Sequence, residues 1–445
     1  MNGARWRRFA TFNLFVAFAF TVMADPVSSV AYAIEAALRA LDGDLSELVL
    51  TMSLVIGTIA LVAATYHQLI GRYPRGGGSS KAMSAAFGEA WAFLPAGALL
   101  VDFMLTIAVS AAASASALIA YEPELEPVRM PLAAAITALV AAGCWFGHRG
   151  RVAFATATLA FVGCAILVAV RGAVAEPADG SAELVGSGSL GPALLAMPLG
   201  MALATGVEAP ENAIAQLAQL DDRRRRIFGQ LTLWAMLAIV GFLTLALTAL
   251  AVRLDVGLPD EDSTLLADVA RAATGGGASF AAFQGTSALL LLAAASSSYF
   301  AGSGLLKALA LYGGEKGGLI PARFGRINRF LVPHWGLAVL LAAAAGLVAL
   351  AGGRDQELVQ FYAAAVFASF LGATLACARL SYRERRMRAL AVNAAATAVV
   401  AFVLALNVVR LDPIASLAAA GLISLHLWRS WVRRGRPGGV AELAG

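Results

Sequence analysis

Long apolar stretches separated by short polar connections run along almost the whole chain. A helix needs about 20 apolar residues to cross the hydrocarbon core of a bilayer, because every backbone polar group must be satisfied within the segment. About twelve stretches reach that length. They lie near residues 10–38, 46–70, 91–120, 130–147, 152–170, 191–218, 227–252, 278–303, 335–352, 356–378, 389–409 and 412–428. The pattern predicts an all-α integral membrane protein with about twelve transmembrane helices.

The composition supports this prediction. Hydrophobic residues make up 60% of the 445 residues and charged residues 14%, whereas soluble domains carry about 25% charged residues. The net charge is +5, but the basic residues form short clusters without interleaved aromatic residues, which disfavours a nucleic-acid partner. Cys144, Cys164 and Cys377 lie in separate apolar runs without a CxxC pair, so neither a disulfide framework nor a zinc site is expected. No cofactor is expected either.

Charge alternates between successive connections. Short loops rich in Lys and Arg stay in the cytoplasm. The basic set holds Arg5, Arg7 and Arg8, Arg72, Arg75 and Lys81, Arg149 and Arg151, Arg223 to Arg226, Lys307 to Arg329, Arg383 to Arg388, and Arg429 to Arg436. The other set is acidic, with Glu122, Glu124 and Glu126, then Glu176, Asp179 and Glu183, then Asp260, Glu261 and Asp262. We therefore expect a multi-pass protein of the cell (inner) membrane with both termini in the cytoplasm.

The N-terminal segment has a second interpretation. Arg-rich residues 5–8, the apolar run that follows and Met23-Ala24 also fit a cleaved signal peptide, whose removal would leave the later loops unchanged. Apolar sequence resumes directly after Asp25 and continues to Leu38, which favours a mature transmembrane segment.

The connections contain no recognisable soluble domain. Gly76-Gly77-Gly78 lacks the GKS or GKT ending of a phosphate-binding loop and predicts a flexible joint. Residues 304–334 predict a connection along the membrane surface. We expect one transmembrane domain over residues 1–431 and a short basic cytoplasmic tail over 432–445.

Four carboxylates lie at or near mid-span: Asp25, Asp102, Glu208 and Glu211. By these boundaries no Lys or Arg lies at that depth, so protons or a bound cation must compensate the negative charge. A single such acid could simply be protonated and hydrogen-bonded between helices. Asp25, Asp102 and Glu208 lie on three different segments beside hydroxyl residues, which favours a shared cation pocket, whereas Glu211 is placed toward the cytoplasmic interface.

Hydroxyl groups follow Asp102 at helical spacing. Asp102, Thr106 and Ser110 recur every four residues and therefore lie along one side of a helix. They could form a ladder of oxygen ligands. The alternative is small-residue packing, because Ser and Thr are ordinary interface residues in membrane helices.

Two segments carry a proline beside polar residues. These are Ala24-Asp25-Pro26-Val27-Ser28-Ser29 and Ala204-Thr205-Gly206-Val207-Glu208-Ala209-Pro210. Proline removes a helical hydrogen bond, and non-helical backbone at membrane depth is tolerated where it is buried or lines a cavity. The two segments run in opposite directions by the charge rule, which predicts inverted repeats near 10–171 and 191–378, extra helices at 389–428, and alternating access.

These strings resemble the amino acid–polyamine–organocation (APC) superfamily, and within it the KimA-like branch of the potassium uptake permeases. The resemblance is carried by Asp25-Pro-Val-Ser-Ser-Val-Ala-Tyr32, Leu-Leu-Val-Asp102-Phe-Met-Leu-Thr106-Ile-Ala-Val-Ser110, Thr205-Gly-Val-Glu208-Ala, Phe361-Tyr362-Ala-Ala-Ala-Val-Phe and Gly-Gly-Leu-Ile-Pro321-Ala-Arg-Phe324. It implies a LeuT-like fold of twelve helices with a five-plus-five inverted repeat and broken helices 1 and 6. It also implies potassium–proton symport, often as a homodimer. The residues that would then line the potassium path are Asp25, Tyr32, Asp102, Thr106, Ser110, Thr205, Glu208 and Tyr362.

The functional prediction is a secondary active transporter for potassium and protons, with Glu208 as the proton-coupling candidate. An amino acid or polyamine permease of the same superfamily is the alternative. An enzyme is not expected, because His67, His148, His334 and His426 are scattered and no nucleophile or metal constellation accompanies them. A channel is disfavoured, since paired broken helices suit alternating access better than a continuous pore.

Overall fold

The computed structural model describes residues 3–147, 151–176, 189–312, 318–409 and 414–439. Within these ranges the chain forms helices and connections and no strand. The helices are α1 (Gly3–Val22), α2 (Ala24–Ser28), α3 (Val30–Ala40), α4 (Leu48–Arg72), α5 (Gly78–Phe87), α6 (Phe93–Tyr121), α7 (Arg129–Trp145), α8 (Arg151–Val174), α9 (Leu190–Gly200), α10 (Ala209–Ala213), α11 (Asp222–Arg253), α12 (Leu265–Thr274), α13 (Gly277–Leu311), α14 (His334–Leu350), α15 (Asp355–Arg383), α16 (Met387–Val409) and α17 (Ile414–Arg433). Short 3-10 turns join several of them, including η4 (Met201–Ala204) and η5 (Ile214–Gln216).

In the described part of the chain, nine helical spans are long and apolar enough to cross a membrane. They are Leu45–Arg72, Glu89–Tyr121, Pro123–Trp145, Ala153–Val174, Leu190–Gln216, Asp222–Arg253, Gly277–Leu311, Asp355–Arg383 and Met387–Val409. Three further predicted spans correspond to shorter or more polar helices, namely α1 to α3, α14 and α17. The helical membrane fold is therefore confirmed, while the count of twelve stays a prediction.

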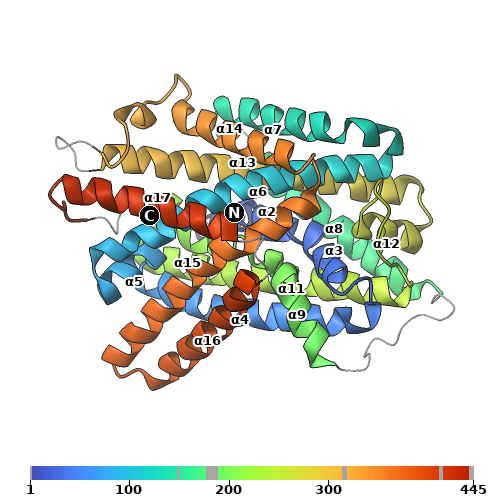
Figure 1. The fold of residues 1–445 in the computed structure, drawn as a ribbon, viewed down its shortest axis with the longest axis horizontal. Coiled ribbons are helices and arrows are strands. Elements are labelled where there is room, and N and C mark those ends of the chain that lie inside the picture. Colours follow the sequence, from blue (N-terminus) through green and yellow to red (C-terminus); the bar gives the residue numbers. More distant parts are fainter. Residues whose placement is uncertain (1–2, 148–150, 177–188, 313–317, 410–413, 440–445) are drawn as a thin grey trace.

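Most of the long helices lie roughly along one direction (Figure 1). The apolar windows of α6 and α15 are 78% and 81% buried, which places these helices at the centre of the bundle. The corresponding windows of α8 and α16 are only 28% and 22% buried. α8 and α16 therefore lie at the periphery of the bundle, with apolar surfaces that suit contact with lipid.

The two segments predicted to be broken differ from each other. In the first, Met23 and Ser29 interrupt the helix but keep right-handed helical angles (φ −73°, ψ −12° and φ −63°, ψ −23°). In the second, Thr205 is extended (φ −59°, ψ 137°) and Gly206 has φ +75°. Proline does not cause this break, contrary to the sequence interpretation. Pro210 lies in the first turn of α10, where the missing N–H costs no helical hydrogen bond.

Two connections contain helices that the sequence did not predict. Gly76 and Gly77 have φ of 84° and 71° and form a turn that leads directly into α5, so the glycine run is a helix start and not a flexible joint. The second is α12, in the connection between α11 and α13. The predicted surface connection at 304–334 also begins too early, because α13 continues to Leu311. Residues 313–317 of that connection, Asp179 and Glu183, and residues 440–445 of the predicted tail lie outside the described residues.

An ion pair joins the end of α4 to the connection after α15. The Arg72 guanidinium donates two hydrogen bonds to the Glu384 carboxylate, at 2.5 and 2.6 Å. This pairing holds the pKa of Glu384 below its ordinary range. Because the Glu384 side chain is 39% exposed, solvent screening limits the contribution of the pair to about 0.5 kcal/mol.

We expect Glu384→Gln to lower the thermal midpoint of the purified protein by about 1 °C at neutral pH. A lowered folded-state pKa stabilises the protein above the ordinary glutamate pKa, and that contribution is lost as the pH falls through the folded-state value. The difference in thermal midpoint between variant and wild type should therefore disappear below about pH 4. Thermal unfolding at neutral pH and below about pH 4 measures this difference. An equal difference under the two conditions would contradict the ion-pair explanation.

Candidate functional site

The break in the second interrupted segment lies directly against the first. A Cβ atom added to Gly206 would lie 2.8 Å from Pro26 Cδ and 3.1 Å from Asp25 Cγ. Gly206 also has φ +75°, a conformation that residues with a side chain rarely adopt. Glycine is thus required both by the backbone conformation and by the close approach of Asp25.

A chain of hydroxyl groups fastens the two breaks together. The Ser29 and Thr205 hydroxyls are hydrogen-bonded to each other. The Tyr32 hydroxyl donates to Ser29 Oγ at 3.1 Å, and the Ser28 hydroxyl donates to the carbonyl oxygen of Asp25 at 2.6 Å. All of these residues are buried. The structure therefore brings together Asp25, Tyr32 and Thr205, which were singled out at separate places in the sequence.

Three carboxylates gather at this junction. Asp25, Asp102 and Glu208 are 8%, 3% and 7% exposed, and each lies within electrostatic range of the other two. Within the described residues, Asp25 Oδ1 and Glu208 Oε2 are buried and accept no hydrogen bond. Burying a charged oxygen without a partner costs several kcal/mol. The junction therefore calls for a proton or a cation beside these oxygens.

The other predicted site residues lie on the central helices. Thr106 and Ser110 are fully buried, one and two turns beyond Asp102 on α6. Tyr362 lies in α15, but its side chain is outside the described residues. In the part of the chain that the structure describes, no group of three or more His, Cys, Asp or Glu side chains is arranged to hold a metal ion. The three acids are therefore neighbours, and a cation among them would need hydroxyl or carbonyl oxygens as further ligands.

A polar cavity begins at Glu208. It is small, with room for about one water molecule, and reaches the start of α5. Its lining residues are Tyr66, Gly77, Ser79, Ser80, Leu99, Glu208, Asn212 and Ser369. Sequence reasoning missed Tyr66, Ser80 and Ser369. Ser79 and Ser80 directly follow the glycine run, so polar residues beside a predicted joint were the signal that could have found them.

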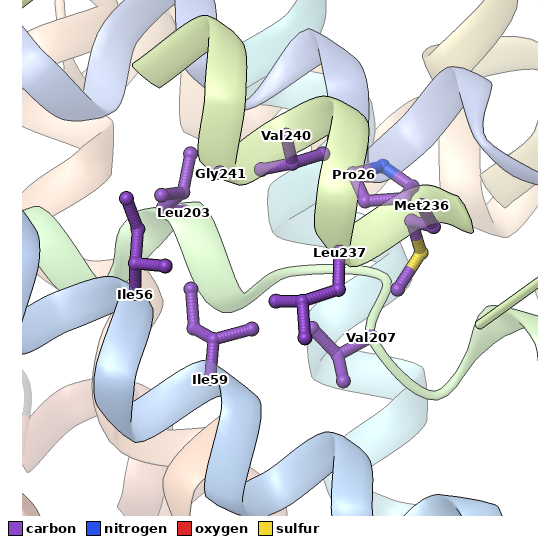
Figure 2. A pocket seen from close by; sticks show the side chains of 9 residues that line it. All are labelled: Pro26, Ile56, Ile59, Leu203, Val207, Met236, Leu237, Val240 and Gly241. Carbon is purple, nitrogen blue, oxygen red and sulfur yellow. The ribbon is translucent and has the colours of Figure 1, made fainter. Parts of the chain in front are cut away.

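A second small cavity, in contrast, is lined by apolar residues (Figure 2). It is bordered by Pro26 of α2, by α4 and α11, and by Leu203 and Val207 on either side of the break. A dehydrated cation needs oxygen ligands, so this hydrocarbon-lined space does not suit one.

Glu211 contacts the start of α5. Its side chain is 1% exposed and accepts hydrogen bonds from the Gly78 N–H and, at 3.3 Å, from the Ser79 hydroxyl. Leaving it out of the acid pocket agrees with these contacts, because its carboxylate is directed to the start of α5.

A second buried polar network escaped the sequence analysis. Arg129 donates to Ser116 Oγ at 2.8 Å, and the Ser116 hydroxyl donates to Asp355 Oδ1 at 2.7 Å. Arg129 and Asp355 are 8% and 7% exposed. Each is the first residue of its helix. The sequence alone would suggest that a charged residue at a helix start is exposed, so the burial of these two side chains depends on tertiary packing.

Comparison with known proteins gives two matches. The family profile described as amino acid permease matches residues 9–422. The potassium transporter KimA of Bacillus subtilis (strain 168) is 26% identical over 360 residues, which cover 78% of this chain and 58% of KimA. The chain thus spans 58% of the length of this relative. Both matches are to transporters and neither is to an enzyme.

Proposed function

The chain belongs to the amino acid permease family, and on that premise we propose that this multi-pass membrane transporter takes up potassium in symport with protons by alternating access. KimA, the relative at 26% identity, is a potassium transporter. Relatives at that identity can differ in substrate, and the chemistry of the site supports potassium as follows.

The observation that carries the proposal is the cluster of Asp25, Asp102 and Glu208 at the contact between the two interrupted segments. Negative oxygens buried together repel each other unless a positive charge lies among them. Hard cations prefer oxygen ligands, and hydroxyls such as those of Ser29 and Thr205 can complete a coordination shell. A monovalent cation without its hydration shell fits this chemistry.

The proton partner follows from the same charge balance. Glu208 borders both the acid cluster and the polar cavity that reaches α5, so it is positioned to exchange a proton when the cation arrives or leaves. Acids in such proximity share their titration, and the proton belongs to the group as a whole. Asp25 and Glu208 each have a buried oxygen that accepts no hydrogen bond among the described residues, and we assign the coupling to Glu208 because it also lines the polar cavity. The same proposal includes a five-plus-five repeat, a homodimer and cytoplasmic termini. It also includes path-lining roles for Thr106, Ser110 and Tyr362.

An amino acid or amine permease is the second candidate, and the match to the amino acid permease profile favours it. Three carboxylates would repel the carboxylate of an amino acid but would attract a polyamine. Polyamine uptake is therefore the form of this alternative that the site supports.

Uptake into proteoliposomes distinguishes these candidates. We expect the purified protein to accumulate a rubidium tracer when an inwardly directed proton gradient is imposed, and excess potassium to compete with it. Putrescine and neutral amino acids should not compete. Putrescine competition without potassium competition would replace the first candidate by the second, and uptake that ignores the proton gradient would contradict symport.

A further inference from the structure

Two short helices outside the main spans lie at opposite ends of the bundle, α5 on the left and α12 on the right of Figure 1. α5 follows α4, and α12 follows α11. In the predicted repeats these are equivalent places, because each helix follows the second span of its repeat. By the charge rule α5 lies on the cytoplasmic side and α12 on the outer side.

The start of α5 is held by an acid from the other repeat. Glu211 belongs to α10, just after the break at Thr205–Gly206, and accepts from the N–H of Gly78, the first residue of α5. The approach is so close that a Cβ on Gly78 would lie 2.9 Å from Glu211 Oε1. A carboxylate at a helix start satisfies otherwise unpaired N–H groups and is favoured by the helix dipole.

The start of α12 is held in the same way and in the reverse direction. Glu35 belongs to α3, after the interruption at Ser29, and accepts from the N–H of Leu265, the first residue of α12, at 3.0 Å. Its other oxygen accepts from Arg39 Nε at 2.9 Å. The Glu35 side chain is 4% exposed, so this contact is shielded from water, as is that of Glu211.

We propose that Glu35 and Glu211 are a reciprocal pair of latches, each of which holds shut one end of the transport path by binding the start of a short helix in the opposite repeat. This inference rests on the proposed alternating access and adds the residues that close each end. Each acid lies on the helix that follows its interruption, so a movement of that helix would act on the short helix through the hydrogen bond. Both latches are closed in this structure.

The inner latch lies at one end of the small polar cavity. The polar cavity extends from Glu208 to Gly77, Ser79 and Ser80 at the start of α5. Moving α5 away from Glu211 would therefore open the cavity at that end. Releasing Glu35 from Leu265 would free α12 at the opposite end and leave α5 in place.

Cysteine accessibility in membrane vesicles of known orientation tests the pair. Cys144, Cys164 and Cys377 are first replaced by alanine, and a single cysteine is then introduced by Ser80→Cys at the inner end or by Gln356→Cys at the outer end. Gln356 is the second residue of α15, on the outer side by the charge rule. It is partly buried and donates to the carbonyl of Tyr32 at 3.4 Å, so it reports on access from the outer end toward the start of α3. The readout is the rate of reaction with a membrane-impermeant maleimide, which does not depend on the transported substrate.

Glu211→Ala should raise labelling at position 80 at least several-fold and leave position 356 unchanged. Gly78→Ala should do the same, because its new methyl group pushes the Glu211 carboxylate away while the acid itself remains. Glu35→Ala should raise labelling at position 356 and spare position 80. Glu47→Ala is the matched control, since Glu47 is 2% exposed and accepts from the backbone N–H of Ser189, which belongs to neither short helix.

Equal labelling increases at both positions would mean general loosening and would overturn the proposal. So would unchanged labelling in a properly inserted Glu211→Ala or Gly78→Ala protein. If potassium is not the substrate, the same labelling pattern should still be obtained, so failure of the substrate assignment and failure of the latches are distinguishable.

Discussion

Asp102→Asn should abolish potassium-dependent growth of a host strain that lacks its own potassium uptake. Asparagine has nearly the same shape but no charge, and the cation loses one of the negative groups that replace its hydration shell. A charge in such a buried site is worth about 3 kcal/mol, so cation binding should weaken roughly 100-fold. Growth at limiting potassium and rubidium-tracer uptake measure the effect.

Asp44→Asn is the control for this experiment. Asp44 lies in the connection between α3 and α4, accepts from the Ser46 N–H at 2.9 Å and has no part in the acid cluster. We expect it to transport like wild type. Unchanged uptake by Asp102→Asn at a normal protein level would remove the acid cluster from the transport path.

Gly206→Ala should have a comparable effect through the backbone. An alanine at φ +75° is strained by about 1–2 kcal/mol, and its methyl group would lie within 3.1 Å of Asp25 Cγ. The break must then either refold or move away from Asp25, and both changes disturb the cation site. Uptake should fall on the order of 10-fold or more, together with a lower thermal midpoint.

Gly57→Ala provides the control for Gly206. Gly57 lies within α4, has no atom within 4 Å of an added Cβ, and needs no unusual φ. Alanine there should leave uptake intact and favour the helix slightly. If Gly206→Ala transported as well as Gly57→Ala, the close approach of the two segments would be irrelevant to transport.

The acids could be predicted from the sequence because the free-energy cost of placing a carboxylate in an apolar span does not depend on the rest of the fold. Asp25, Asp102 and Glu208 each interrupt a long apolar stretch, and a carboxylate there needs compensation whatever the fold. A shared pocket was predicted because the three acids lie on different segments, each beside hydroxyl residues. The structure does bring the three carboxyl groups within electrostatic range.

Features that depend on packing could not be predicted. Pro26 and Pro210 attracted attention as helix breakers, yet the unwound residues are Thr205 and Gly206, where the demand for glycine comes from contact with Asp25. The α5 and α12 helices are too short to show a clear periodic pattern. Glu35 lies near the end of its predicted span, where a residue at the membrane interface is expected. Its contact with Leu265, 230 positions away, cannot be seen in the sequence.

Potassium binding to the purified protein tests the central claim most directly. A ligand that binds the folded state raises its thermal midpoint. We predict that potassium, but not an equal concentration of a large organic cation, stabilises the wild-type protein, and that Asp25→Asn, Asp102→Asn and Glu208→Gln each lose most of this shift. A potassium-dependent shift that survives in all three variants would contradict the account.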